Sequence, residues 1–271
     1  VVHAFESIIR VARTFDRAAD HHDHPANSLW SRVGRQLVSR AAVARGMNVL
    51  DAACGSGASA IPAAQRVGRE GSVVAIDLSP RLLAIGRARA MAHRLRHLRF
   101  LHDDLRTPPV PDGSQDVVLC GLGLHLVPNV VEGIQALWAT LRPGGRLALA
   151  LFGRDPFAPA HEILMTALRR EGLSDEWHWP WERLATVTAL REVLMMAGVP
   201  APQVEVEEGT HPLPTAEDWW TLVLGSDYRA VVDRLAVDAR DRVRRETLAV
   251  LEQRAIGAVR LEVLYATVQK A

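Results

Sequence analysis

A short apolar strand that runs directly into a glycine-rich turn constrains the fold of this chain more than any other feature of its sequence. The stretch Val49-Leu50-Asp51-Ala52-Ala53-Cys54-Gly55-Ser56-Gly57 has this form, and helical spacing follows to about Val67. Glycine lacks a Cβ, so the backbone of such a turn can approach a ligand closely. The helix that follows offers unpaired N–H groups at its N-terminus. The stretch therefore predicts a nucleotide-binding turn.

Strand and helix patterns alternate around this turn. Alternation of this kind is typical of a parallel, doubly wound α/β sheet. Helices are also expected over residues 3–20 and 28–44, separated by the polar stretch 21–27. Asn129 is expected to cap a helix. The predicted core strands lie near 47–52, 72–78, 97–103, 115–121 and 145–151, and the helices between them near 57–68, 80–93 and 129–141.

The glycine turn fits two kinds of ligand, a dinucleotide and a ligand that carries positive charge. Residues 55–60 fit the dinucleotide pattern G-x-G-x-x-(G/A), and Asp77 follows at the spacing of a ribose-binding acid. Asp51 argues against a dinucleotide, because a carboxylate beside the turn repels a pyrophosphate. A ligand with an ammonium and a sulfonium, such as S-adenosylmethionine (SAM), tolerates that acid. An NAD-dependent oxidoreductase stays as the less favoured alternative.

Five segments over residues 47–152 together resemble the class I SAM-dependent methyltransferases. The likeness is nearest to the ubiquinone/menaquinone-biosynthesis type and to small-molecule methyltransferases of bacterial natural-product pathways. It implies a Rossmann-like, doubly wound mixed sheet of seven strands whose last pair is antiparallel, with a helical substrate cap. Gln115, where the family often has an aromatic residue, and Thr107-Pro108-Pro109 depart from the family pattern. The five segments are 49–57, 73–79, 100–105, 111–118 and 141–147.

The resemblance divides the chain into three parts. Residues 1–45 form N-terminal helices that close the site, residues 46–152 form the SAM-binding core, and residues 153–271 complete the sheet. Ligands of open α/β sheets bind at the carboxyl ends of the strands, and the cap insertions near 153–182 and 213–255 are expected to cover that edge. In this last part, helices are predicted over 157–171, 186–197 and 215–255, and strands over 204–207 and 261–268.

The resemblance also assigns residues to the cofactor. Asp77 would accept hydrogen bonds from both ribose hydroxyls, and Leu78 would lie against the adenine. Asp104, chosen over its neighbour Asp103, would bind the adenine amino group, with the Leu105 N–H nearby. Each role has a structural alternative. Asp77 could cap a helix, Leu78 could pack in the core, and Asp104 could be a solvated loop acid. The two glycines could form a plain tight turn, and Asp51 could be a buried acid bonded to its neighbours. The methionine side of SAM is expected near Asp51, Ala53, Gly55, Gly57, Gly121 and Leu122.

Methyl transfer from a sulfonium is an in-line displacement that depends mainly on proximity and the exclusion of water. A general base is required only where the nucleophile holds its proton firmly. His125, just past the fourth predicted strand, is the candidate base. The alternative is a histidine packed beneath the cap.

The acceptor is predicted to be a small, apolar or aromatic metabolite, because the predicted cap is rich in Trp, Leu and Val. Whether its O, N or C atom is methylated stays open. Aromatic side chains of the cap are candidate pocket walls, although they fit a small core of the cap equally well. A SAM-binding protein without methyl transfer, either a cyclase or a binding module, is the main alternative function. The candidate acceptor-binding residues are Phe15, Trp30, His178, Trp179, Trp219 and Tyr228, and Trp177, Trp181 and Trp220 raise the same choice.

Several classes of protein are disfavoured. A net charge of +1 gives no electrostatic case for nucleic acid, and residues 121–124 lack the Asn/Asp-Pro-Pro-aromatic turn that enzymes methylating exocyclic amines share. No apolar run approaches the ~18 residues of a membrane helix, and no signal peptide is visible.

Cys54 and Cys120, the only cysteines, are expected as reduced core thiols in a cytoplasmic protein. The run His21, His22, Asp23, His24 is expected to form a solvated loop with no metal. The apolar cap helices could serve a homodimer.

Overall fold

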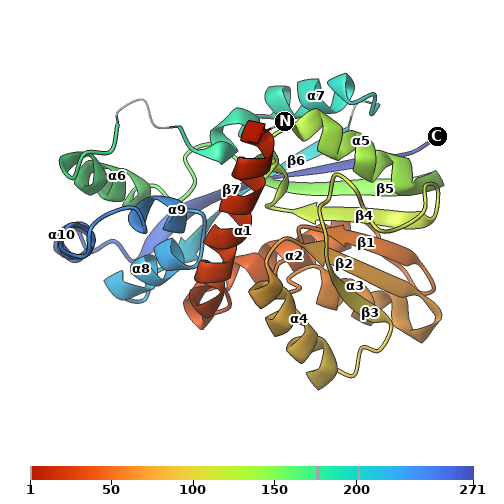
Figure 1. Cartoon of the computed structure of the whole chain (residues 1–271), viewed down its shortest axis with the longest axis horizontal. Helices are drawn as coiled ribbons and strands as arrows, with labels where there is room; N and C mark the ends of the chain where they lie inside the picture. The colour runs from red at the N-terminus through yellow and green to blue at the C-terminus, as the bar shows by residue number, and fades with distance from the viewer. Residues whose placement is uncertain (1, 175–177, 201) are drawn as a thin grey trace.

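The fold is built on one mixed β-sheet, shown in a computed structural model in Figure 1. The structure describes residues 2–174, 178–200 and 202–271, with side chains from residue 8 onward in the first helix. Within these residues the sheet has seven strands in the order β3-β2-β1-β4-β5-β7-β6. The strands are β1 (Asn48–Ala52), β2 (Ser72–Asp77), β3 (Leu98–His102), β4 (Gln115–Gly121), β5 (Leu141–Phe152), β6 (Gln203–Pro212) and β7 (Ala258–Gln269).

The pairing of the strands confirms the predicted fold class. β1 to β5 run parallel, and β7 lies antiparallel between β5 and β6. The strand order reverses between β1 and β4, which is where open α/β sheets bind their ligands. Ala52 pairs with both Ile76 and Cys120, so β1, β2 and β4 end at one level. Asp77 and Gly121 close their strands beside the turn that follows β1.

Two apolar layers cover the sheet because successive side chains of a strand point to opposite faces. Val49 belongs to the buried cluster beneath α2, α3 and α4, whereas Leu50 belongs to the cluster beneath α5 and α7. The near-continuous apolar runs of the central strands follow from burial on both faces. These helices are α2 (Leu29–Arg40), α3 (Ala60–Val67), α4 (Pro80–Ala92), α5 (Val130–Thr140) and α7 (Val187–Met196).

Four further helices form a cap beyond the end of β5, at the left of Figure 1. They are α6 (Ala160–Arg170), α8 (Ala216–Leu224), α9 (Arg229–Val232) and α10 (Val237–Gln253). Helix α1 (Val2–His22) crosses the molecule between this cap and α4, and it contacts α4, α8 and α9. The N-terminal helix therefore lies over the carboxyl ends of the central strands. Among the described helices, none combines the length and the apolarity needed to cross a bilayer.

The predicted elements correspond to observed ones, with two corrections. The helical pattern over 215–255 is interrupted at residues 225–228 and again at 233–236, so it forms α8, α9 and α10 rather than one continuous helix. The run His21–His24 is not a solvated loop throughout: α1 continues through His22, and a short 3-10 helix, η1 (Pro25–Asn27), follows His24. The predicted cap of α5 is confirmed, since the Asn129 side chain accepts a hydrogen bond from the Glu132 amide at 3.3 Å.

Candidate functional site

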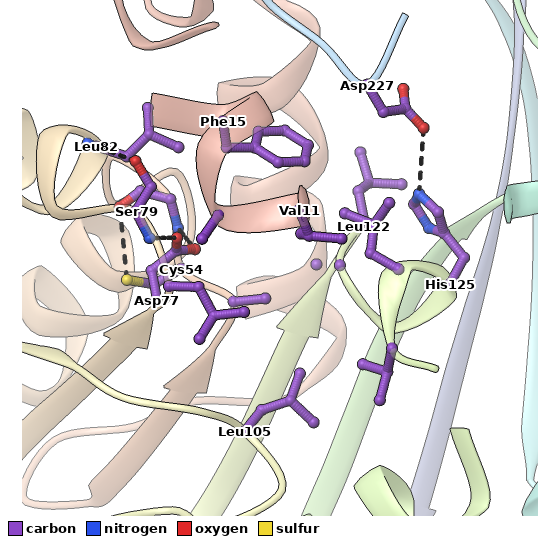
Figure 2. Close-up of a pocket in the computed structure, with 18 of the residues that line it drawn as sticks. Val11, Phe15, Cys54, Asp77, Ser79, Leu82, Leu105, Leu122, His125 and Asp227 are labelled. Carbon is purple, nitrogen blue, oxygen red and sulfur yellow. Dashed lines mark hydrogen bonds and ion pairs between the residues drawn. The ribbon is translucent and has the colours of Figure 1, made fainter. Parts of the chain in front are cut away.

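A cavity of about 1170 Å³, part of it open to solvent, lies at the carboxyl ends of β1, β2 and β4, beneath α1 (Figure 2). Apolar side chains form most of its wall, as is usual for small-molecule sites. Eleven of the predicted site residues line it: Phe15, Trp30, Ala53, Gly55, Asp77, Leu78, Asp104, Leu105, Gly121, Leu122 and His125.

The turn after β1 has a left-handed backbone at three positions. Ala53, Gly55 and Gly57 have φ of +55°, +52° and +92°. A Cβ at Gly57 would meet the Phe100 ring at 3.1 Å and Ile61 at 3.2 Å. Gly57 does not line the cavity, so its glycine is required by packing and the predicted contact with the cofactor is not supported. Of the two glycines in this turn, Gly55 is the one that lines the cavity.

Asp77, at the end of β2, connects this turn to α4. Its Oδ2 accepts a hydrogen bond from the Gly55 amide at 2.8 Å, and its Oδ1 accepts one from the Ser79 amide at 2.9 Å. The side chain is half-buried and lines the cavity. Burial raises the pKa of Asp77 above its usual value, although these two hydrogen bonds lower it in part. Ser79, not Asp77, caps α4, because its Oγ accepts from the Leu82 amide.

Asp51 lies under the cavity floor and does not line the cavity. Both of its carboxylate oxygens accept from the Ser59 hydroxyl, at 2.9 and 2.7 Å. Burial raises the pKa of Asp51 to about 7. The alternative of a buried acid bonded to its neighbours therefore describes this residue, and any influence on a ligand passes through Ser59, which does line the cavity.

Asp103 and Asp104 both line the cavity beyond β3. The Asp104 carboxylate forms an ion pair with Arg106 at 2.7 Å and accepts from the Arg106 amide at 2.9 Å. Asp103 accepts from the Asp104 amide at 2.9 Å. Arg106 already occupies some of the lone pairs of the Asp104 carboxylate. Asp103 is therefore as well placed as Asp104 to accept a hydrogen bond from a ligand amino group.

The turn after β4, like the turn after β1, contains a residue with positive φ. Leu122 has φ of +56°, an unusual backbone for a branched residue, and its amide donates to the Ala150 carbonyl at 2.8 Å. A Cβ at Gly123 would overlap the Cβ of Ala53. The two turns therefore touch, and both place a non-glycine residue with positive φ in the cavity wall, as functional sites often do.

His125 and Asp227 meet at the opposite side of the cavity from Asp77 (Figure 2). The His125 Nε2 lies 3.9 Å from the Asp227 Oδ2. Burial lowers the pKa of His125 to about 3 and raises the pKa of Asp227 to about 7. The imidazole is therefore neutral at pH 7. Asp227 is not among the predicted site residues, because it lies in the break between α8 and α9, within the region 215–255 predicted to be helical.

Helix α1 is held to both sides of the cavity. On the core side, the Asp16 carboxylate accepts from the Ser79 hydroxyl at 2.6 Å and from the Arg81 amide at 3.1 Å. On the cap side, the Nδ1 of His22 lies 2.8 Å from the Gly225 carbonyl oxygen, and its ring stacks on Trp30 at 5.1 Å. His22 lines the cavity and was missed, because the histidine run gave no sign that α1 continues into the core.

A second cavity of about 1390 Å³, also partly open to solvent, adjoins the first. The two share Phe15 and His125, while His178 and Trp179 line only the second. The candidate acceptor residues Phe15, Trp30, His178 and Trp179 thus line two adjoining cavities. The other residues shared by both cavities are Val11, Leu126, Pro128 and Asp227.

Trp219 and Tyr228 correct the prediction, because both are fully buried and line neither cavity. They belong to the core of the cap, where the Tyr228 ring packs edge-on against Trp179, Trp181 and Trp219 at 4.6, 5.5 and 5.6 Å. Such contacts stabilise the cap and fix the wall from behind. Trp220 is also buried, and Trp177 lies outside the described residues.

The charges of the first cavity fit a cationic ligand. Four carboxyl groups line it, from Asp77, Asp103, Asp104 and Asp227, against the single guanidinium of Arg106. This balance suits a sulfonium and an ammonium and disfavours a pyrophosphate. Within the described residues, no group of three or more His, Cys, Asp or Glu side chains is placed to hold a metal ion. The residues present therefore fit SAM.

Comparison with known proteins agrees with this geometry. The family description "Methyltransferase domain" matches residues 49–145. A demethylmenaquinone methyltransferase of Listeria welshimeri is 30% identical over 139 residues, which cover 51% of this chain and 58% of that protein. The aklanonic acid methyltransferase DauC of Streptomyces sp. strain C5 is 31% identical over 173 residues, or 62% of this chain and 79% of that protein.

Solved structures share the fold. A SAM-dependent methyltransferase from Aquifex aeolicus superposes with a TM-score of 0.54 at 15% identity, over 92% of this chain and 96% of that one. The [4+2]-cyclase SpnF reaches the same TM-score at 16% identity, over 89% and 81%. The sheet order, the acid at the end of β2 and the match to DauC over most of its length agree: this chain belongs to the class I SAM-dependent methyltransferase family, whose cofactor is SAM.

Proposed function

We propose that the protein transfers the methyl group of SAM to a small apolar or aromatic acceptor. One observation carries the proposal: Asp77 and the His125–Asp227 pair face a single cavity from opposite sides, with Val11 and Leu122 between them (Figure 2). A cofactor held at the first end and an acceptor at the second would meet beneath α1.

Asp77 binds the ribose hydroxyls in this proposal. Its oxygens each accept one hydrogen bond from the protein, and a carboxylate has about four acceptor positions, so capacity remains for two hydroxyls. Leu78 and Leu105 contact the adenine, and Asp103 or Asp104 accepts from its amino group. The methionine part lies along the turns after β1 and β4, at Ala53, Gly55, Gly121 and Leu122.

When bound, SAM supplies a methyl group on a sulfonium, and its transfer forms a bond from the acceptor atom to carbon while the carbon–sulfur bond breaks and its electrons stay on sulfur. The protein excludes water from this site by covering it with α1, which Asp16 and His22 hold in place. Fixing the acceptor atom in line with the methyl contributes most of the rate.

His125 takes the acceptor's proton in this mechanism. Burial lowers its pKa to about 3, so the imidazole is unprotonated at pH 7 but is a weak base in this environment. Asp227, 3.9 Å away, stabilises the imidazolium that forms. Both residues border both cavities, which supports a position between the cofactor and the acceptor.

The names of the relatives support the class of acceptor. They give demethylmenaquinone and aklanonic acid as the acceptors of those proteins. The first is covered over only 58% of its length, so its acceptor is a probe here and not an assignment. The division into a closing segment (1–45), a core (46–152) and a capped remainder (153–271), a cytoplasmic location and a homodimer stay predictions.

The test is a reaction of the full chain with SAM and each of these two compounds, followed by mass spectrometry for S-adenosylhomocysteine (SAH) and methylated product. Asp77→Ala is the negative variant. Product formed by the wild type and lost in the variant would support methyl transfer. SAM binding with no consumption by any acceptor would favour the cyclase or binding-module alternative.

A further inference from the structure

The two adjoining cavities differ in their charge. The first, where SAM is proposed to bind, is lined by four carboxyl groups and one guanidinium. The second is lined by three guanidinium groups, from Arg10, Arg183 and Arg234, against the carboxyl groups of Glu182 and Asp227. Burial raises the pKa of Asp227 to about 7, so its charge is only partly present at neutral pH. The outer cavity is therefore the more positive one.

Arg183 is the best-placed of these cations. Its guanidinium donates to three backbone carbonyls, of His125 at 2.5 Å, of Pro128 at 3.5 Å and of Val127. None of these carries a charge, and within the described residues no carboxylate lies within ion-pair distance of Arg183. A guanidinium has five N–H donors, so at least two remain. The side chain is thus fixed, positively charged and uncompensated at the rim of the second cavity.

Arg10 supports the same interpretation from the facing helix. It lies on α1, five residues before Phe15, and lines the second cavity. Among the described residues it makes no ion pair. Trp179, Pro180 and Phe15 supply apolar wall between the cations. An apolar cavity whose wall includes guanidinium groups, one of them fixed as Arg183 is, suits an aromatic body that carries an acidic group.

We propose that the second cavity holds the acceptor and that the acceptor is an anion, an aromatic or polycyclic molecule whose carboxylate binds Arg183, with Arg10 on the other side of the opening. This inference rests on the proposed function, since it assigns the acceptor half of that site. His125 and Asp227 then contact the acceptor at the inner end, while the carboxylate stays at the outer end.

The test compares two probes that differ only in charge, anthraquinone-2-carboxylate and anthraquinone-2-carboxamide, titrated into the full chain saturated with SAH. Charge-assisted hydrogen bonds to a guanidinium are stronger than neutral ones, so the carboxylate should bind at least about tenfold more tightly than the amide. The preference should also weaken as salt is raised.

Variants show which residue causes the preference for the carboxylate probe over the carboxamide probe. Arg183→Gln should reduce it to within about threefold, and Arg10→Gln should reduce it in part. Arg13→Gln is the matched control, because Arg13 is exposed on the same helix and lines neither cavity, so it should change nothing. Within the part of the chain that the structure describes, Arg10 is exposed and makes no ion pair, so Arg10→Gln separates loss of the anion site from misfolding.

The result that overturns the inference is equal binding of the two probes, no binding of the carboxylate, or a preference that survives Arg183→Gln. The SAH titration made beforehand keeps this failure apart from failure of the proposed function. Normal SAH affinity with no carboxylate preference would sink the anionic acceptor alone, whereas no SAH affinity would sink the proposed cofactor site itself.

Discussion

The Oδ2 atom of Asp77 lies 2.8 Å from the Gly55 amide nitrogen and accepts its hydrogen bond. This contact joins the end of β2 to the turn after β1, across two strands that pair in parallel. The carboxylate therefore has two tasks: it holds the glycine turn in its left-handed form, and it presents its remaining lone pairs to the cavity.

Asp77→Ala should lower the affinity for SAM by at least about 100-fold, because two charge-assisted hydrogen bonds to the ribose are lost. Calorimetric titration with SAM and SAH measures this. Asp77→Asn keeps one acceptor for the Gly55 amide and should lose less. Asp112→Ala is the control, since Asp112 is exposed and lines neither cavity. Wild-type affinity in Asp77→Ala would remove Asp77 from the cofactor site.

Gly34→Ala should destabilise the fold and weaken SAM binding together. A Cβ at Gly34 would lie 2.8 Å from the Ser59 amide nitrogen, and the Ala58 carbonyl would be closer still. Helix α2 would be pushed off a turn whose Ala58 and Ser59 line the cavity. We expect a loss of about 1–3 kcal/mol in the free energy of unfolding, measured in urea. Gly257→Ala, with no atom within 4 Å of its Cβ position, should be near neutral.

His125→Gln should reduce kcat by about 100-fold or more once an acceptor is found, because the base is lost, while SAH affinity stays unchanged. Asp227→Asn should reduce kcat less, since the imidazole remains. Burial lowers the pKa of His125 to about 3 and raises the pKa of Asp227 to about 7, so the part of an acid limb near pH 7 that comes from Asp227 should disappear in Asp227→Asn. Full activity in His125→Gln would mean that proximity alone drives the transfer.

The order of elements and the cofactor end of the site could be predicted from the sequence, because both are local. Each strand end and the turn after it are a few residues apart, and the parallel sheet brings Asp77, Gly55 and Gly121 to one edge by register alone. Gly57 shows the limit: its spacing fits a ligand turn, yet its Cβ position is filled by Phe100.

The acceptor end could not be predicted, because its residues come from segments that are distant in the chain. An apolar helical pattern in such a segment fits a pocket wall and the core of the cap equally well. Trp219 and Tyr228 are as apolar as a pocket wall but lie in the core of the cap. Asp227 comes within 3.9 Å of His125 only because α8 ends at Leu224, and no local signal outweighed the helical spacing on either side. His22 reaches the cavity through its partner Gly225, about 200 residues away in the chain.

Asp51→Asn should remove a pH dependence of stability. Burial raises the pKa of Asp51 from 3.8 to about 7. Between about pH 4 and pH 7 the folded protein keeps a proton that the unfolded chain has lost, so the wild-type free energy of unfolding falls as pH rises through this window and levels off above it. The amide cannot ionise and still accepts from Ser59. The advantage of Asp51→Asn over the wild type should therefore grow by a few kcal/mol, to order of magnitude, between about pH 5 and about pH 8.

Urea unfolding of the wild type, Asp51→Asn and Asp112→Asn across that range measures this advantage. Asp227, whose pKa burial also raises to about 7, contributes the same slope to all three proteins, so it cancels in the differences. Asp112→Asn should run parallel to the wild type, because Asp112 is exposed and lines neither cavity. A constant difference between Asp51→Asn and the wild type would show that burial does not raise the pKa of Asp51, and the hydrogen bonds from Ser59 would then be sufficient to hold the carboxylate in its ionised form.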